Sequence, residues 1–241
     1  MQHSLPDGVR VYAIGDIHGL AWSLDMMLGA IEADAADNPF DGTLIEVFLG
    51  DYVDRGADSF GVIERLMRPP GGGRTRVCLR GNHEQALMDA AHDLDTMVRW
   101  MTFGGGETMK SYGVDVDRHA HDPQALQPLL EAALPERHRA FLHGLPRSHT
   151  LGDVLFVHAG IRPGVALDNQ DPNDLIWIRE PFLSDPAPLP AHIVHGHTPT
   201  DDPFRDARRT NVDTGAVYGG MLTAAVLEGD TARFLAVPGA R

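Results

Sequence analysis

The chain has 241 residues, of which 43% are apolar, and this is enough to bury one sizeable core. Its formal net charge of −14, with histidine neutral, argues against a polyanion such as a nucleic-acid backbone as the main partner. Cys78 is the sole cysteine and no stretch approaches membrane-spanning length, so we expect a cytoplasmic protein without a disulfide that binds neither nucleic acid nor membrane.

The N-terminal part of the chain predicts a parallel β-sheet. Short, continuously apolar runs at 11–14, 44–49 and 76–79 are typical of strands that are covered on both faces. Helix-like stretches at 20–36 and 59–67 separate these runs. Strand, helix and strand in this order indicate βαβ units with right-handed crossovers.

A long helical segment follows the first predicted sheet. Residues 86–150 are expected to form a mainly helical insertion, and the better amphipathic helix candidates lie at 85–101 and 135–145. Glycine and proline residues at 68–74 predict a surface loop rather than a boundary between domains, because a strand follows at once.

Further strands are predicted in the C-terminal part. Apolar runs at 154–157 and 192–194 resemble the earlier strands. The segment "MLTAAVLEGDTARFLAV" (221–237) predicts two strands joined by the turn "EGD", which is a terminal hairpin. We interpret residues 1–241 as a single α/β domain.

Several predicted strands end in a shared pattern of an apolar run, a glycine and then a residue that offers a lone pair. The pattern places Asp16, Asp51, Asn82 and His197 after strands, and His158 ends a further strand. Glycine permits close approach of the backbone, so the next side chain can point over the carboxyl edge of a sheet, where ligands bind in open α/β folds. We therefore expect these side chains to meet at one edge of one sheet.

With His18, which lies two residues after Asp16, the set contains two carboxylates, one carboxamide and three imidazoles. It has too few charges for a calcium cage and lacks the thiolates of a structural zinc site, so it suits Mn²⁺, Fe or Zn²⁺ in a two-metal centre. Taken singly, each ending could be a turn or a helix cap. Together they favour metal binding, because unpaired buried carboxylates would cost several kcal/mol each. His195 is an alternative to His197, although the shared pattern favours His197.

Short motifs occur along the chain in a recognisable order. They are "GDIHG" (15–19), "GDYVDRG" (50–56), "GNHE" (81–84), "HAG" (158–160) and "GHT" (196–198). In these motifs the sequence resembles the phosphoprotein phosphatase family of the calcineurin-like metallophosphoesterases, over roughly residues 10–220, and in particular the bacterial and phage-type serine/threonine phosphatases. The resemblance implies a calcineurin-like fold, a β-sandwich flanked by helices in four layers (α/β/β/α), with two metal ions over its edge.

The resemblance also implies which side chains would hold the metals. The first metal would be held by Asp16 and His18, Asp51 would bridge, and the second would be held by Asn82, His158 and His197. We expect Mn²⁺, with Fe and Zn²⁺ as alternatives, although availability in the cell decides between close competitors.

Further residues carry roles by the same resemblance. His83 would be the general acid, oriented by Asp54, and Arg55 would bind the substrate phosphate. Arg179 in "DLIWIRE" would be a second phosphate-binding arginine, and the alternative for it is a surface ion pair with Glu180.

The expected activity is that of a metal-dependent phosphomonoesterase acting on serine/threonine phosphoproteins or a small phosphoester. A hydroxide shared by two metal ions would attack phosphorus directly, and His83 would protonate the leaving alkoxide. The alternative is a diadenosine tetraphosphate (dinucleoside polyphosphate) hydrolase, a family that resembles this one but typically lacks the residue corresponding to Asp54 and ends its third motif in "GNHD" rather than with Glu84. A catalytically silent binding module would be expected to have lost some ligand positions, and none is missing. The sequence leaves the physiological substrate, native metal and oligomeric state open.

Overall fold

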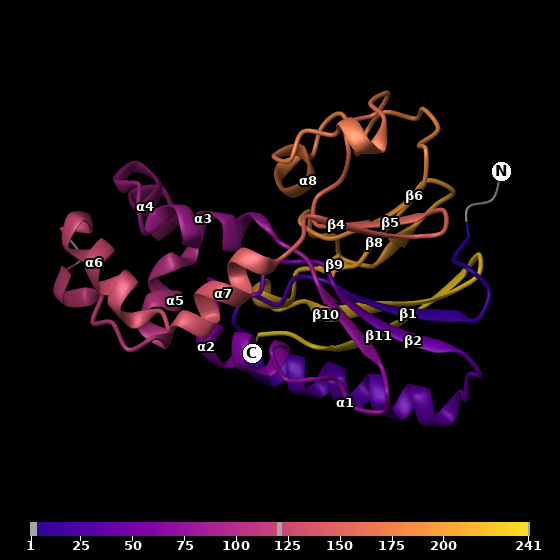
Figure 1. The fold of residues 1–241 in the computed structure, drawn as a ribbon, viewed down its shortest axis with the longest axis horizontal. Coiled ribbons are helices and arrows are strands. Elements are labelled where there is room, and N and C mark those ends of the chain that lie inside the picture. The colour runs from indigo at the N-terminus through magenta and orange to yellow at the C-terminus, as the bar shows by residue number, and fades with distance from the viewer. Residues whose placement is uncertain (1–3, 120–121, 241) are drawn as a thin grey trace.

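The computed structural model describes residues 4–119 and 122–240. Two β-sheets stack against each other in these residues, and helices lie on the outer side of the first sheet and at one end of the molecule (Figure 1). The expected fold, a mixed α/β sandwich flanked by helices, is confirmed. No helix in this part of the chain combines the length and the apolarity needed to cross a membrane.

The first sheet contains the predicted βαβ units. Its parallel strands are β1 (Val9–Ile14), β2 (Thr43–Phe48) and β3 (Thr75–Cys78), and they are connected by α1 (Ala21–Asp37) and α2 (Ser59–Leu66). These bounds agree closely with the ranges expected from the apolar runs. Continuous apolarity was informative here because β1 and β2 are largely buried, whereas the edge strand β3 is only partly buried.

The C-terminal strands complete the first sheet on its other side. β10 (Met221–Glu228) pairs antiparallel with β1, and β11 (Thr231–Pro238) pairs antiparallel with β10, so the predicted hairpin is confirmed. The short strand β9 (Asp213–Thr214) also pairs with β10, and the 3₁₀ turn η4 (Ala216–Tyr218) lies between these two strands.

The second sheet has the strand order β4-β5-β6-β8-β7. Its strands are β4 (Ser148–Leu151), β5 (Val154–Val157), β6 (His192–His195), β7 (Phe204–Arg205) and β8 (Arg209–Asn211). The expectation of one edge of one sheet is therefore wrong, because β5 and β6 do not pair with β1–β3. A continuous apolar run shows that a strand is buried on both faces, but it carries no information on which strand lies beside it.

Alternate side chains of the strands fill different layers of the core. Val11 of β1 and Phe156 of β5 belong to the cluster between the two sheets, whereas Tyr12 of β1 packs under the helices. Val157 of β5 packs on the outer face of the second sheet, with Phe182 of the segment that follows. Burying each such side chain stabilises the fold by about 1.5–3 kcal/mol.

The outer face of the second sheet is covered largely by irregular chain. The segment 159–191 crosses it and contains the 3₁₀ turn η3 (Leu167–Asn169) and the short helix α8 (Asp174–Trp177). The helical layer on this side is thus much thinner than the one that α1 and α2 form on the first sheet (Figure 1).

The expected helical region forms a lobe that projects from the sandwich, at the left of Figure 1. The predicted helix at 85–101 is interrupted, because the Asp93 side chain accepts a hydrogen bond from the Thr96 backbone N–H at 2.7 Å and starts a new helix there. The elements of the lobe are α3 (Asn82–Ala90), α4 (Leu94–Trp100), the π-turn η1 (Met101–Gly105), α5 (Gly106–Ser111), η2 (Asp117–His119), α6 (Pro123–Ala133) and α7 (Glu136–Gly144).

Candidate metal centre

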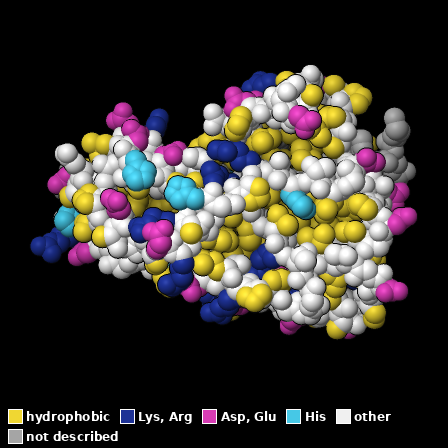
Figure 2. All heavy atoms as spheres, viewed as in Figure 1, with side chains coloured by type: hydrophobic (Ala, Val, Ile, Leu, Met, Phe, Trp, Pro, Cys, Tyr) yellow, Lys and Arg dark blue, Asp and Glu magenta, His cyan; other side chains and the backbone are white. Residues whose placement is uncertain are grey.

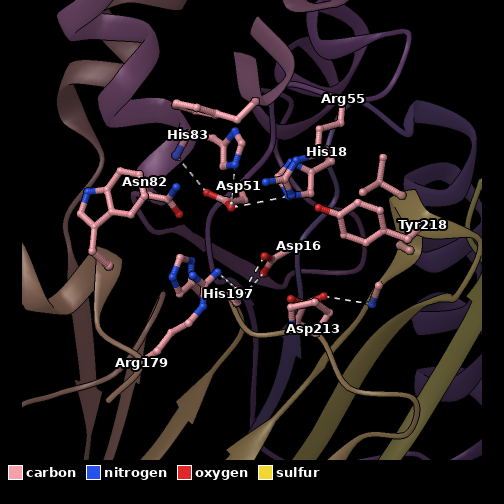
Figure 3. A pocket seen from close by; sticks show the side chains of 16 residues that line it. Asp16, His18, Asp51, Arg55, Asn82, His83, Arg179, His197, Asp213 and Tyr218 are labelled. Carbon is pink, nitrogen blue, oxygen red and sulfur yellow. Dashed lines mark hydrogen bonds and ion pairs between the residues drawn. The ribbon is translucent and has the colours of Figure 1, made fainter. Parts of the chain in front are cut away.

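A pocket of about 290 Å³ lies where strands of both sheets end (Figure 3). Most of the side chains predicted for the site line it, namely Asp16, His18, Asp51, Arg55, Asn82, His83, Arg179 and His197. Asp54 and His158 are fully buried and contact the lining residues from behind. The predicted site residues therefore come together in one pocket, although the strands that carry them belong to two sheets.

The motif glycines allow the strand ends to approach each other. A Cβ atom on Gly15 would lie 2.6 Å from the Val212 carbonyl oxygen, so β1 could not pass the end of β8 with a larger residue there. A Cβ atom on Gly50 would lie 2.6 Å from the Gly81 backbone nitrogen, and Gly50 has a φ of 109°. Glycine is required at both positions because the backbones are in contact.

Backbone strain is concentrated in the site. Within the described ranges, the non-glycine residues with positive φ have values from 46° to 74°, and all of them belong to the predicted set: His18, Asp51, Asp54, Arg55 and His197. Such conformations are uncommon for residues with a side chain and persist only where the surroundings hold them. The fold therefore imposes these side-chain directions.

The histidine and amide groups of the second predicted metal subsite present lone pairs to one another. His158 Nδ1 donates to the Leu49 carbonyl at 3.0 Å, which leaves Nε2 as an acceptor. This atom lies 2.9 Å from Asn82 Oδ1, 3.2 Å from His197 Nδ1 and 3.4 Å from Asp51 Oδ1. Burial lowers the pKa of His158, so a second proton on its ring is disfavoured. Converging lone pairs without a proton between them fit a cation.

The first predicted subsite has a similar arrangement. His18 Nδ1 donates to the Val53 carbonyl at 2.9 Å, so its Nε2 lone pair faces the pocket, 3.6 Å from Asp51 Oδ2. His18, Asp51 and His83 each offer a ligand atom within 4.8 Å of the others. Asp16 lies outside this close group, and its oxygens accept the His197 backbone N–H at 3.2 Å.

The carboxylates of the pocket are buried near one another, and too little positive charge surrounds them to stabilise their ionised forms. Burial raises the pKa of Asp16 well above its usual value, and the nearby Asp213 raises it further. Burial also raises the pKa of Asp51, with a further contribution from Glu84. Divalent cations would supply the missing charge, so the donor set as a whole fits a pair of such ions.

His83 and Asp54 form a buried pair beside this cluster. His83 Nδ1 lies 2.6 Å from Asp54 Oδ2, and its ring is therefore oriented by the carboxylate. Burial lowers the pKa of His83 and raises the pKa of Asp54 to about 7. Both shifts favour the net-neutral form of the pair, which carries one proton between Oδ2 and Nδ1 and one proton on Nε2.

Two donors from the helical lobe also bind Asp54, and neither is among the predicted site residues. Trp100 Nε1 donates to Oδ2 at 2.7 Å, and the Thr108 hydroxyl donates to Oδ1 at 2.6 Å. Both residues lie far from Asp54 in sequence and carry no motif of their own, so only the folded chain reveals the contacts.

The two predicted phosphate-binding arginines reach the pocket from opposite sides (Figure 3). Arg55 Nη1 lies 2.6 Å from His18 Nε2, and its guanidinium is 5.4 Å from the centre of the Tyr218 ring. Arg179 Nη2 donates to the His197 carbonyl at 3.4 Å. Arg179 lines the pocket, and the structure shows no ion pair between it and Glu180 among the described residues; its phosphate-binding role stays a prediction.

Glu84, the last residue of the third motif, connects this motif with the second one. Its carboxylate accepts backbone N–H groups from the second motif and from its own: Gly81 and Asp51 at 2.9 Å, Tyr52 at 2.7 Å and Val53 at 3.3 Å. It thereby holds the loop that carries Asp51 and Asp54 against the start of α3.

His195, the alternative to His197, lies in the core of the second sheet. Its Nε2 is 3.1 Å from Arg209 Nη1, and its ring packs 5.1 Å from that of Phe182. Asp213, which is not among the predicted site residues, does line the pocket. It is the first residue of the short strand β9 and follows Val212 rather than a glycine, so the strand-end pattern of the predicted ligands does not identify it.

The family comparison agrees with this geometry. Residues 9–220 match the calcineurin-like phosphoesterase family. The chain belongs to this family. It is thus a hydrolytic metallophosphoesterase, and the members of this family use a dinuclear divalent metal centre.

Individual relatives carry different names. The chain is 29% identical to serine/threonine-protein phosphatase 1 of Salmonella typhimurium over 227 residues, covering 91% of this chain and 92% of the relative. It is 26% identical to an asymmetrical bis(5′-nucleosyl)-tetraphosphatase of Geobacillus thermodenitrificans over 235 residues, covering 90% and 89%. The crystal structure of a cold-active protein-tyrosine phosphatase of Shewanella sp. superposes with a TM-score of 0.61 at 18% identity, covering 98% of this chain and 83% of that one, which shows a shared fold.

Proposed function

We propose that this metallophosphoesterase is a phosphomonoesterase that acts on serine/threonine phosphoproteins. The buried Asp54–His83 pair at the pocket, with Nδ1 and Oδ2 2.6 Å apart, carries the proposal. A serine or threonine alkoxide is a strongly basic leaving group and needs a proton donor, whereas the leaving group of a nucleotide anhydride is a weak base. The similarity to a serine/threonine phosphatase supports the same substrate class.

The metal ligands in this proposal are the six strand-end residues. Asp16 and His18 would hold one ion, Asn82, His158 and His197 would hold the other, and Asp51 would contribute to both. When bound, the ions supply an activated water and neutralise charge on the phosphoryl oxygens. Mixed carboxylate, amide and imidazole donors suit Mn²⁺, and Fe and Zn²⁺ are the alternatives.

The remaining side chains bind and protonate the substrate. Arg55 and Arg179 bind the phosphoryl oxygens, because a planar guanidinium fits phosphate in a bidentate manner. His83 delivers the proton on Nε2 to the leaving oxygen, and Asp54 holds Nδ1 so that Nε2 faces the pocket. No covalent bond between enzyme and phosphorus is needed in this scheme.

A second candidate is hydrolysis of dinucleoside polyphosphates. Two exposed aromatic side chains line the pocket, Trp177 at 47% and Tyr218 at 66% exposure, and such rings can stack on nucleobases. The relative named bis(5′-nucleosyl)-tetraphosphatase supports this candidate. The anhydride would, however, make little use of the proton on His83.

A substrate panel tests the proposal. The protein is stripped of metal and assayed with Mn²⁺, Zn²⁺ or Mg²⁺ added separately, on a phosphoserine peptide and on diadenosine tetraphosphate. We expect the highest activity with Mn²⁺, and kcat/KM on the phosphopeptide at least about tenfold above that on the dinucleotide. The reverse preference would establish the second candidate. Absence of turnover on both would contradict the proposal, and Asp51→Asn provides the inactive control.

A further inference from the structure

The segment 100–108 ("WMTFGGGET") of the helical lobe lies directly against the second motif. It comprises the last residue of α4, the π-turn η1 and the first residues of α5. Only Phe103 of this segment lines the pocket, and the proposed reaction uses none of its side chains. Its contacts nevertheless converge on Asp54 and its neighbours.

Both oxygens of the Asp54 carboxylate are held by this segment. Trp100 Nε1–H donates to Oδ2 at 2.7 Å, on the same oxygen that His83 Nδ1 contacts at 2.6 Å. The Thr108 hydroxyl donates to Oδ1 at 2.6 Å, and its oxygen accepts the Asp54 backbone N–H at 2.8 Å. Trp100 and Thr108 are both fully buried, so water cannot replace either donor without opening the lobe.

The same segment supports the strained backbone of the second motif. Asp54 and Arg55 have φ values of 74° and 68°, a conformation that costs energy for residues with a side chain. The Arg55 backbone N–H donates to the Gly104 carbonyl at 3.2 Å, and the Asp54 backbone N–H donates to Thr108. The lobe therefore holds the backbone of Asp54 in place and also orients its two carboxylate oxygens.

The His83 ring is also confined by the segment. Its centre lies 5.0 Å from that of Phe103 with the rings at 89°, an edge-to-face arrangement. With Nδ1 bound to Asp54 and one side of the ring against Phe103, little freedom remains for the direction of Nε2.

We propose that Trp100 and Thr108 are positioning residues, which lock the Asp54 carboxylate so that His83 Nε2 points at the leaving oxygen of the substrate. This inference rests on the proton-donor role of His83 in the proposed function. The χ2 torsion of an aspartate is broad, so a carboxylate without these donors can rotate and carry the imidazole with it. The effect is selective, because only substrates whose leaving group needs a proton depend on the direction of Nε2.

The sharpest test uses Thr108, because two substitutions separate its hydroxyl from its shape. Thr108→Val keeps the volume and removes the hydroxyl, whereas Thr108→Ser keeps the hydroxyl. Trp100→Phe removes the indole donor and is a second, independent variant. Thr210→Val is the control, since Thr210 is also buried and its hydroxyl contacts His192 Nε2 at 2.8 Å outside the pocket.

Each variant is assayed with Mn²⁺ on a phosphoserine peptide and on p-nitrophenyl phosphate, whose leaving group is acidic, and its Mn²⁺ stoichiometry is measured. We expect Thr108→Val and Trp100→Phe to lower kcat on the peptide about tenfold or more and on the aryl ester about twofold or less, with KM and Mn²⁺ binding retained. Thr108→Ser should recover most of the peptide activity. Thr210→Val should lower the melting temperature without changing the ratio of the two activities.

His83→Asn is assayed in the same series, and it separates the two proposals. A selective loss on the peptide in His83→Asn, together with equal losses on both substrates in Thr108→Val and Trp100→Phe, would overturn the positioning role alone. Equal losses in His83→Asn would remove the proton-donor role and the proposed function's mechanism with it. Peptide activity as low in Thr108→Ser as in Thr108→Val would likewise overturn the positioning role, because the hydroxyl would then not be the group that matters.

Discussion

Glu84 is buried beside the metal-binding side chains, yet its carboxylate contacts only backbone in the hydrogen bonds described above. Four N–H groups share its two oxygens, which is close to the full accepting capacity of a carboxylate. Burial raises the pKa of Glu84 to about 7, whereas the four donors favour the ionised form, in which both oxygens accept. The Glu84 side chain therefore has a structural role: its carboxylate holds the loop that carries Asp51.

Glu84→Gln should therefore destabilise the protein strongly. The amide offers one accepting oxygen and places an NH₂ donor against backbone donors, so we expect a loss of roughly 3–5 kcal/mol in the free energy of unfolding. Urea denaturation of the metal-free protein measures it. Glu107→Gln is the matched control, because Glu107 forms an exposed pair with Lys110 at 3.2 Å and its substitution should leave stability almost unchanged. A loss below about 1 kcal/mol for Glu84→Gln would contradict this account.

Residue-scale prediction from the sequence worked where the chemistry is local. Asp16, Asp51 and Asn82 each follow a strand and a glycine, so their positions relative to a sheet edge can be derived from neighbouring residues. Trp100 and Thr108 contact Asp54 across 46 and 54 residues of sequence, and no periodicity or motif predicts such contacts.

At the scale of elements, the stretch from Asn82 to Ser111 has a helical sequence pattern but folds into several short segments instead of one helix. The expected helix at 85–101 ends early because Asp93 caps a new one, and a π-turn then interrupts the path at Phe103 and Gly104. Gly104 has a φ of 121°, which only glycine adopts readily. With these interruptions, Trp100 and Thr108 contact Asp54 of the second motif, and Phe103 packs against His83.

Gly105→Ala tests how tightly this turn is packed. An added Cβ would lie 2.4 Å from Cδ2 of the Trp100 indole, so the ring or the turn must move. We expect a loss of about 1–3 kcal/mol in stability and a fall in peptide turnover. Gly106→Ala is the neighbouring control, because its Cβ would meet only Met101 Cε at 3.4 Å and Val116 Cγ1 at 3.9 Å. Equal stability and activity of the two variants would show that the indole is not confined.

At the scale of the whole molecule, the proposed ligands come from two separate sheets. Asp16, His18 and Asp51 follow strands of the first sheet, whereas His158 and His197 follow β5 and β6 of the second. Bound ions would therefore connect the two halves of the sandwich. Figure 2 shows acidic side chains scattered over the face in view, in keeping with the net charge of −14, whereas most of the proposed metal ligands line the pocket.

Metal binding should accordingly stabilise the entire fold. With Mn²⁺ at about a hundredfold its Kd, the gain is about 2.7 kcal/mol, which corresponds to a rise of about 5–10 °C in Tm for a chain of this size. Scanning calorimetry with and without a chelator measures the rise. His158→Asn should reduce it, while His149→Asn, on β4 and outside the pocket, should retain it. The same rise in both variants would show that the ions do not bind between the sheets.

The sequence by itself determined the local part of this protein: which runs are strands, where they end, and which lone-pair side chains follow them. These features depend on burial and on glycine at particular positions, and short stretches of sequence are enough to indicate both. The tertiary structure decided that the strands divide between two sheets and that the lobe supplies the donors to Asp54. Strand pairing and contacts across about 50 residues depend on how separate surfaces fit together, and a one-dimensional pattern does not contain that information.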